Sequence, residues 1–514
     1  MKRLGSAALV LVLASLAAVY VYGRFAERAR GEPSVALPAI DDGVPLDRWV
    51  AGKTDAHPGQ TGMQVLGDNI DAFAMRALSA RAAGRSLDLQ YYIWHPDLTG
   101  GLLQAELLRA ADRGVRVRLL LDDMNVRDGT EDLAALDSHP SIEVRLFNPT
   151  RARQDSLWRG VEMLLRFVSI NRRMHNKAWI VDNRMAIVGG RNIGDEYFDA
   201  SGEVNFRDTD VVVVGPAVGQ ASDIFDAYWN SPSAIPLRAL QQAEDGQLDA
   251  LRAAASRPLD SMAAKAYLRR IRESDSVQSL VQGGGPMHWS ADARVVSDPP
   301  EKAEGASMDA TWLTPQLVEE MNRARHELKL ISPYFVPGDA GVDWISGLRR
   351  RGVEVGILTN SLAANDVVAV HGGYAGYRLP LLREGVSLFE LMPHGKSKSS
   401  WFGSSGASLH TKAFVLDDDG GFIGSFNLDP RSANLNTEMG LLFRHPAMAE
   451  ELELIYADKT SASDSYALYL EDGRLRWRDG STDPATTWTH EPEASAWRRM
   501  VARVIGWLPV ESQL

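Results

Sequence analysis

The residues best able to do chemistry in this chain belong to a motif that occurs twice. Each copy has a histidine, a lysine two residues later, an aspartate, a glycine turn and an asparagine at the same spacing, and a glutamate 28 residues after the histidine. The members are His175, Lys177, Asp182, Asn192 and Glu203 in the first copy, and His410, Lys412, Asp417, Asn427 and Glu438 in the second. A single His-x-Lys pair usually has no function, but two copies with one spacing predict a duplicated active site.

These residue types suit the chemistry of a phosphodiester. This anion resists attack, so its cleavage needs a nucleophile, donors around the non-bridging oxygens, and an acid for the leaving alkoxide. Histidine can act as nucleophile or acid, while lysine and asparagine can hold the oxygens. Residues i and i+2 of a strand share a face, so each histidine is expected beside its lysine. The glycines at 189, 190 and 424 allow the backbone to approach a phosphate closely.

The two glutamates are expected to support the imidazoles. Glu203 and Glu438 can each accept a hydrogen bond from a ring nitrogen, which fixes the tautomer and raises the basicity of the ring. The sequence leaves open which glutamate serves which histidine. The copies differ where Gly190 replaces the serine found at Ser425. The first cradle therefore lacks one hydroxyl donor, which makes Asn192 and backbone amides more important there.

Composition narrows the class of protein. The chain has 514 residues, 45% of them hydrophobic, which fits an ordinary globular core. Its net charge of −12 disfavours general nucleic-acid binding, so any basic recognition surface must be local. The chain has no cysteine, which excludes disulfides, thiolate catalysis and cysteine-ligated zinc.

The N-terminus predicts a membrane anchor. Lys2 and Arg3 precede an uncharged stretch from Leu4 to Gly23, and about 20 residues are needed to cross a bilayer as a helix. A cleaved signal peptide is the alternative, but its apolar region is usually shorter. Basic residues flank the stretch on both sides, so the sequence leaves the orientation open.

The rest of the chain predicts an α/β fold with two related domains. Each half has a strand (86–94; 327–335), a helix (102–111; 342–348), a second strand after a glycine (115–121; 353–358), a third strand (142–147; 386–391) and then the motif. We divide the chain into an anchor (1–30), a linker (31–60), a first α/β domain (61–236), a helical insertion and linker (237–290), a second α/β domain (291–460), and a C-terminal hairpin and helix (461–514).

The doubled motif resembles the HKD motif of the phospholipase D superfamily, residue by residue. The resemblance implies two pseudo-twofold-related domains, each a mixed β-sheet flanked by helices, that share one site within a monomer. It implies that His175 attacks phosphorus to form a phosphohistidine and that His410 acts as acid and base. Lys177, Lys412, Asn192 and Asn427 would hold the phosphate, while Asp182 and Asp417 would be mainly structural members of the catalytic set. No metal or other cofactor is implied.

Further residues narrow the resemblance to the bacterial cardiolipin synthase C branch. They include Arg173–Lys177, Phe206–Asp210, Ser332–Phe335, Asn360–Ala363, Val370–Tyr374 and Asn434–Glu438. The branch implies transfer of a phosphatidyl group from phosphatidylglycerol or phosphatidylethanolamine to phosphatidylglycerol, at the bacterial inner membrane. The alternative is a hydrolase that acts on phospholipid, with nucleic acid the less favoured substrate.

One segment before the first motif bears on the substrate. Residues 151–173 contain six arginines interleaved with apolar residues: Arg151, Arg153, Arg159, Arg166, Arg172 and Arg173. A basic amphipathic helix of this kind can lie on anionic lipid. The alternative, given equal weight, is a solvated helix that packs its apolar face on the domain.

Overall fold

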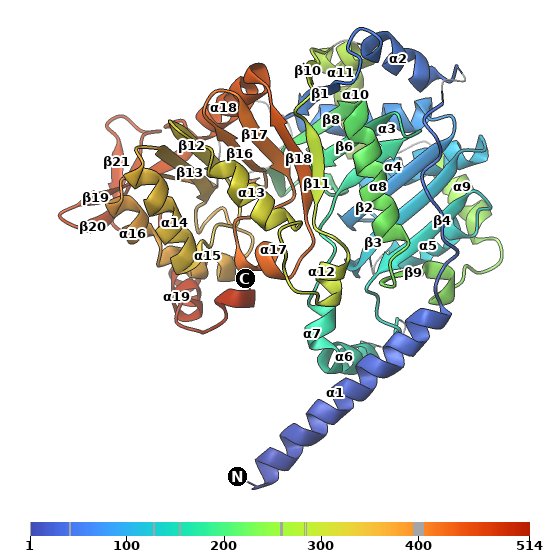
Figure 1. Ribbon diagram of the computed structural model, residues 1–514, viewed down its shortest axis with the longest axis horizontal. Helices are drawn as coiled ribbons and strands as arrows, with labels where there is room; N and C mark the ends of the chain where they lie inside the picture. The colour runs from blue at the N-terminus through green and yellow to red at the C-terminus, as the bar shows by residue number, and fades with distance from the viewer. Residues whose placement is uncertain are drawn as a thin grey trace.

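The computed structural model describes residues 2–40, 43–126, 129–153, 156–256, 261–281, 283, 285–393 and 406–513. The two α/β halves lie side by side, and a long N-terminal helix projects from the first half (Figure 1). This architecture confirms the predicted fold class, and both halves of the predicted pattern fall on regular elements.

The first half is built on a nine-stranded mixed sheet. Its strand order is β10-β1-β8-β6-β5-β2-β3-β4-β9. The strands are β1 (Thr61–Leu66), β2 (Ser86–Ile93), β3 (Arg116–Asn125), β4 (Ile142–Phe147), β5 (Ala178–Val181), β6 (Met185–Gly189), β8 (Asp210–Val214), β9 (Ala234–Pro236) and β10 (His288–Ser290). The helices of this half and the following insertion are α3 (Asn69–Ala82), α4 (Leu98–Asp112), α5 (Thr130–Asp137), α8 (Pro216–Trp229), α9 (Gln247–Ser256), α10 (Met262–Glu273) and α11 (Asp275–Val281).

The second half repeats this arrangement in a ten-stranded sheet. Its order is β11-β18-β17-β16-β12-β13-β14-β19-β20-β21. The strands are β11 (Arg294–Ser297), β12 (Glu327–Ile331), β13 (Glu354–Asn360), β14 (Ser387–Leu391), β16 (Lys412–Leu416), β17 (Gly420–Gly424), β18 (Met439–Arg444), β19 (Ser465–Glu471), β20 (Arg474–Asp479) and β21 (Thr486–Trp488). The helices are α12 (Glu301–Glu304), α13 (Leu313–Met321), α14 (Gly338–Arg350), α15 (Val368–Ala375), α16 (Arg378–Arg383), α17 (Pro430–Asn434), α18 (Pro446–Lys459) and α19 (Ala496–Ile505).

The same strand order in both sheets explains how the two motifs become equivalent. Strands β1-β8-β6-β5-β2-β3-β4 of the first sheet correspond to β11-β18-β17-β16-β12-β13-β14 of the second. One buried apolar cluster draws on both halves, including Ile180 and Val211 from the first sheet and Val415 and Ile423 from the second. A short parallel pair, β7 (Val204–Arg207) with β15 (Gly406–Leu409), also joins the halves. The halves therefore share a continuous core.

The predicted linker and C-terminal region are structured as well. Helix α2 (Pro45–Thr54) forms within residues 31–60 and buries Leu46 and Val50. The C-terminal hairpin formed by β19 and β20 pairs with β14, so it extends the second sheet. The helix expected around 497–507 is α19.

The N-terminal helix α1 (Lys2–Arg28) is long and apolar enough, over Leu9–Arg28, to cross a membrane. It rests near its end on α6 (Ser156–Leu165), where the Arg166 and Arg151 guanidinium groups stack on Tyr22 and Phe25. The N-terminal part of this helix projects away from the two halves (Figure 1). This helix therefore marks the side of the molecule that an anchored protein would turn toward a bilayer.

The expectation of a basic, lipid-facing surface on residues 151–173 is wrong for most of its arginines. Arg159, Arg166 and Arg173 are buried, and Arg153 forms an ion pair with Asp123. The exposed side chains of α6 and α7 (Phe167–Ile170) are instead apolar: Leu157, Trp158, Leu164, Phe167 and Val168. A buried charge without a partner is costly, so these arginines pair with acidic side chains of the protein. With the arginines turned inward, the apolar side chains of α6 and α7 face outward.

Asp182 and Asp417 hold the starts of the strands next to the motifs. The Asp182 carboxylate accepts hydrogen bonds from the backbone N–H groups of residues 84, 85 and 86, just before and at the start of β2. Asp417 accepts from residues 325, 326 and 327 at the start of β12. Both aspartates have positive φ, 53° and 48°, at tight turns. Their contacts are structural, and neither bonds an imidazole in the described part of the chain.

Replacing Asp182 by alanine is expected to lower the free energy of unfolding by roughly 2–4 kcal/mol, because three backbone N–H groups, one of them buried, lose the charged acceptor that Asp182 provides. Asp182→Asn should cost less, since asparagine keeps one acceptor oxygen and tolerates the left-handed backbone. Asp417→Ala should also cost less, because Asp417 is only partly buried. Urea unfolding measures all three values. An Asp182→Ala protein that is fully stable but inactive would contradict the structural role.

Candidate active site

Each motif histidine is bonded to a carboxylate from the opposite half. His175 Nδ1 lies 2.7 Å from Glu438 Oε2, and His410 Nδ1 lies 2.5 Å from Asp208 Oδ2. All four side chains are buried, each with less than a tenth of its surface exposed. A carboxylate at Nδ1 holds the proton there, so Nε2 of each ring is left for chemistry. The site is therefore completed only when the two halves pack together.

The backbone holds both histidines in the same crossed way. The N–H of His175 donates to the carbonyl of Thr437, the residue before Glu438, at 2.9 Å. The N–H of His410 donates to the carbonyl of Arg207, the residue before Asp208, at 2.8 Å. Each imidazole thus receives a backbone and a side-chain contact from two consecutive residues of the other half. This fixes both the position and the orientation of the ring.

The two lysines are buried beside the histidines. Lys177 Nζ donates to the carbonyl of His175 at 2.7 Å, and Lys412 makes the same bond to His410. Burial lowers the pKa of Lys177 to about 7 and that of Lys412 to about 8, although nearby carboxylates oppose the shift. An anion bound between these ammonium groups would restore their full charge. The lysines are therefore placed to neutralise a phosphate.

The charges of the two motifs act on each other. Burial lowers the pKa of His175 to about 4 and also lowers the pKa of His410, and both Lys177 and Lys412 add to the effect at each ring. Burial alone would raise the pKa values of Glu438 and Asp208, but the facing imidazoles and lysines outweigh it and hold both below their ordinary values. The two motifs form one electrostatic cluster in which the carboxylates stay ionised and the imidazoles are neutral near pH 7.

The prediction for Glu438 is confirmed, but the prediction for Glu203 is wrong. Glu203 is exposed, and Asp208 takes its place at His410. In the sheets, Gly189 pairs with Asp210 and Gly424 pairs with Gly440, so the residues two positions earlier, Asp208 and Glu438, are equivalent. The first copy has 16 positions from asparagine to carboxylate and the second has 11. The extra residues of the first copy include β7. The shared spacing of 28 residues from histidine to glutamate was therefore accidental for Glu203.

The first copy has Gly190 where the second has Ser425, and this difference follows from the use of Asp208 in the first copy and Glu438 in the second. A Cβ atom at Gly190 would collide with the carboxylate of Asp208. In the second half the equivalent Ser425 hydroxyl instead donates to Glu438 Oε2 at 2.5 Å. The shorter aspartate needs a closer backbone, and the longer glutamate leaves room for a hydroxyl. A glycine is therefore required at position 190 because Asp208 occupies the adjacent space. The sequence could have shown this relation only if Asp208, and not Glu203, had been identified as the carboxylate of the first copy.

The two asparagines lie in the site with different contacts. Asn192 Oδ1 accepts from the N–H of Ile93, and its amide donates to the Tyr197 hydroxyl at 2.9 Å. Asn427 is buried, and its Oδ1 atom has no hydrogen-bond partner among the described residues. Both polar groups of the Asn192 side chain are therefore bonded within the protein, whereas Asn427 could accept from a ligand hydroxyl through Oδ1 and donate to a phosphate oxygen through its amide N–H groups.

Sequence reasoning missed a second supporting carboxylate, Asp122. It bonds the Arg173 guanidinium at 2.6 Å and accepts from the N–H of Met174 at 3.0 Å. Both partners immediately precede His175, so this buried ion pair sets the approach of the chain to the motif. Asp122 lies at the end of β3, and no local motif marks it.

The sequence is similar to known proteins over both halves that carry the motifs. Residues 79–229 and 317–458 match the family described as "Cardiolipin synthase, PLD-like domain". The chain is 44% identical to cardiolipin synthase C of Escherichia coli (strain K12) over 88% of this chain and 96% of the relative. It is 32% identical to an uncharacterised protein of Helicobacter pylori (strain 26695) over 84% of this chain and 86% of that one.

A solved structure shares the fold. The crystal structure of phosphatidylserine synthase of Haemophilus influenzae Rd KW20 aligns with a TM-score of 0.54 and 13% identity, covering 90% of this chain and 96% of that one. The chain belongs to the family of proteins with the cardiolipin synthase, phospholipase D-like domain. The two matched segments are the two halves that carry the motifs, which confirms the superfamily and the branch predicted from the sequence.

Substitution at Asp208 separates the two candidate carboxylates. Asp208→Asn is expected to reduce kcat/KM by roughly 100- to 10,000-fold, because His410 loses the charge that supports its proton transfer. Glu203→Gln, the matched control, should stay within about twofold because its side chain is in solvent. Phosphatidyl transfer measured on both purified variants is the test. Equal losses at the two positions would remove Asp208 from its assigned role.

The pH dependence of kcat/KM is expected to be bell-shaped. With His175 as the nucleophile that the family resemblance implies, protonation of its ring would block attack, so the rate should fall as the pH drops toward about 4. Deprotonation of Lys177 and Lys412 removes the positive charge that binds the anion, so the rate should fall as the pH rises through about 7 to 8. Initial rates on a soluble short-chain phospholipid measure both limbs. A flat profile to pH 10 would show that the lysines remain charged in the free enzyme.

Proposed function

We propose that the protein is a phosphatidyltransferase that forms cardiolipin by moving a phosphatidyl group to phosphatidylglycerol through a phosphohistidine. The observation that carries the proposal is the pair of buried imidazoles, each held by a carboxylate of the other half, with a buried lysine bonded to the backbone carbonyl of each histidine. The similarity to cardiolipin synthase C over most of both chains supports the same activity.

The first step is attack on phosphorus. The Nδ1 proton of His175 is held by Glu438, so the Nε2 lone pair is free to bond phosphorus. As that bond forms, the bond from phosphorus to the leaving alcohol oxygen breaks, and His410 donates its Nε2 proton to that oxygen. Lys177, Lys412 and Asn427 stabilise the charge on the non-bridging oxygens. The released product is glycerol or ethanolamine, according to the donor lipid.

The second step reverses these roles. Neutral His410 takes the proton from a hydroxyl of phosphatidylglycerol, the new oxygen–phosphorus bond forms, and the bond to His175 Nε2 breaks. Binding of the phosphodiester anion favours the protonated form of His410 that the first step needs, because it offsets the nearby lysines. The short contact from Asp208 to His410 supports that cation.

The assignment of His175 as nucleophile rests on its surroundings. Glu438 also accepts from the hydroxyls of Ser425 and Ser432, at 2.5 and 2.9 Å, so it is a firmly held acceptor. The pKa of His175, lowered to about 4 by burial, keeps the ring neutral as a nucleophile requires.

We also propose how the enzyme is placed in the cell. Helix α1 would anchor it in the bacterial inner membrane, with phosphatidylglycerol and phosphatidylethanolamine as lipid substrates. The exposed apolar side chains of α6 and α7, near the end of α1, would enter the lipid surface. One chain carries both motifs, so the protein can act as a monomer with an internal pseudo-dimer.

The identity of the acceptor tests the function directly. Purified full-length protein in mixed vesicles with labelled phosphatidylglycerol, with and without phosphatidylethanolamine, should give cardiolipin as the main product. His175→Ala serves as the inactive control. Phosphatidic acid as the main product at every lipid density would identify a hydrolase, in which water takes the acceptor position.

A further inference from the structure

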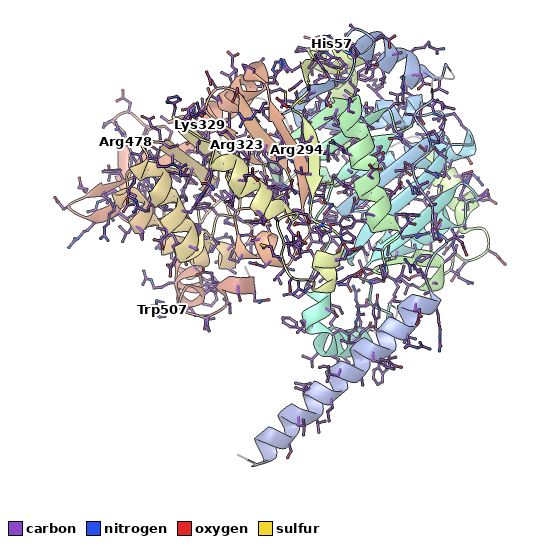
Figure 2. All side chains as sticks on the ribbon, in the orientation of Figure 1. His57, Arg294, Arg323, Lys329, Arg478 and Trp507 are labelled. Carbon is purple, nitrogen blue, oxygen red and sulfur yellow. The ribbon has the colours of Figure 1, made fainter. Side chains whose placement is uncertain are left out.

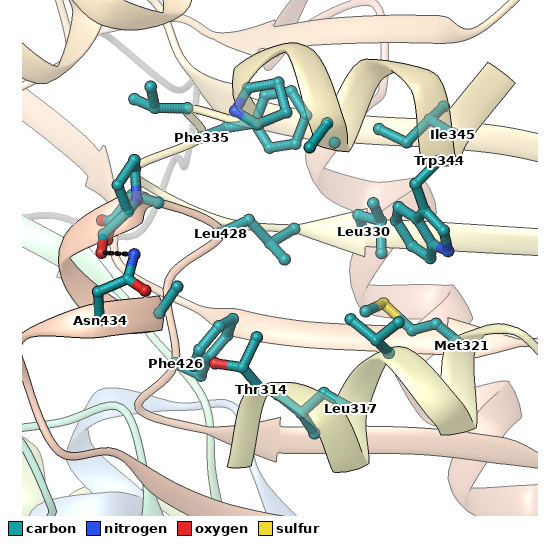
Figure 3. Close-up of a pocket in the computed structure, with 18 residues that line it drawn as sticks. Thr314, Leu317, Met321, Leu330, Phe335, Trp344, Ile345, Phe426, Leu428 and Asn434 are labelled. Atoms are coloured by element: carbon teal, nitrogen blue, oxygen red, sulfur yellow. Dashed lines mark hydrogen bonds between the residues drawn. The ribbon is translucent and has the colours of Figure 1, made fainter. Parts of the chain in front are cut away.

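A largely apolar cavity of about 440 Å³ lies in the second half, between α13 and α14. Figure 3 shows the side chains of the two helices facing each other across a floor that includes residues of β12 and of the loop after β17. The lining is mainly hydrocarbon: Leu317, Met321, Leu330, Phe335, Trp344, Ile345, Phe426 and Leu428. The volume falls in the range of ordinary ligand sites, and an apolar lining selects an apolar occupant.

The cavity adjoins the catalytic cluster. Phe426 and Leu428, both in its lining, flank Asn427 of the phosphate cradle. Asp429 also lines the cavity, and its charge acts on both Lys412 and Glu438. One end of the cavity therefore lies next to the groups that would hold the phosphate, while the rest extends into hydrocarbon surroundings.

The cavity opens beside an exposed apolar surface. Ala340 and Asn434 at its rim are exposed. Helix α17, which ends at Asn434, contacts the C-terminal turn Glu511–Gln513. Just before that turn, Trp507 is 76% exposed and projects from the edge of the molecule (Figure 2).

The same C-terminal turn reaches the segment beside α1. The Gln513 side chain accepts a hydrogen bond from Asn171, the residue after α7, at 2.7 Å. The exposed apolar residues of α7 and the C-terminal segment thus lie on the side from which α1 projects (Figure 1). A lipid leaving a bilayer on this side would meet the rim of the cavity.

We infer that this cavity binds one acyl chain of the phospholipid whose phosphate lies between His175 and His410. The inference rests on the proposed function and adds a subsite to it. The phosphate would lie at Asn427, and the chain would pass Phe426 and extend between α13 and α14. Such a subsite would bind long-chain lipids more tightly than short-chain ones, because each buried methylene is worth roughly fourfold in affinity.

Filling the cavity tests the inference. Ala340→Phe places a ring at the rim, and Val318→Phe fills the cavity from the α13 side. Both are expected to lower kcat/KM for long-chain phosphatidylglycerol at least roughly tenfold and to leave that for a dibutanoyl lipid within about twofold. Ala457→Phe, an exposed position on α18 away from the cavity, should change neither. Unchanged long-chain preference in both filled, folded variants would overturn the inference.

Crosslinking separates this subsite from the activity itself. Phosphatidylglycerol with a diazirine at the end of one acyl chain should label peptides of α13 or α14 in the full-length protein, and Ala340→Phe should reduce that labelling. Labelling confined to α1, α6, α7 and α19 would show that the chains stay in the bilayer, which contradicts the subsite. If the probe labels α13 or α14 but the same protein makes no cardiolipin, the acyl-chain subsite stands and the proposed function is overturned.

Discussion

The proposed mechanism requires two imidazoles at one phosphorus, and the chain supplies them from segments 235 residues apart. The contacts from each histidine to the carboxylate of the other half meet this requirement. Neither half can orient its own histidine, since Glu438 serves the first motif and Asp208 serves the second. The shared apolar core and the β7–β15 pair hold the two halves in the position that these bonds need. The packing of the two halves is therefore needed both for the shared core and for the orientation of the two histidines.

The cluster also shows how a protein can bury opposite charges without losing function. Two lysines and two carboxylates are almost completely removed from water. Isolated, each would be costly, but together they offset one another and keep both carboxylates ionised. The balance leaves the lysines with lowered pKa values, so an arriving phosphodiester gains more from them than it would from solvated ammonium groups. Binding and catalysis thus draw on the same buried charges.

The sequence predicted the features that repeat and missed those that break the repeat. Glu438 was predicted from a spacing that it shares with Glu203 only by accident. The two strand–helix–strand units and the motif strands β5 and β16 follow from periodicity and spacing. Asp208 does not, because β7 lengthens the first copy and moves its carboxylate away from the position of Glu203. The arginines of residues 151–173 were predicted on the surface, yet most are paired inside. A linear pattern of charge cannot show which acidic partner, such as Asp123, comes close only after folding.

The identity of the residue that carries the covalent intermediate tests the account most directly. The full-length His410→Ala variant can be supplied with a phospholipid whose leaving group needs no proton, then digested and analysed by mass spectrometry. The account predicts a phosphatidyl adduct on the peptide containing His175 and no adduct in the His175→Ala protein. An adduct on His410 in the wild-type protein, or labelling that survives His175→Ala, would contradict the assignment of the nucleophile.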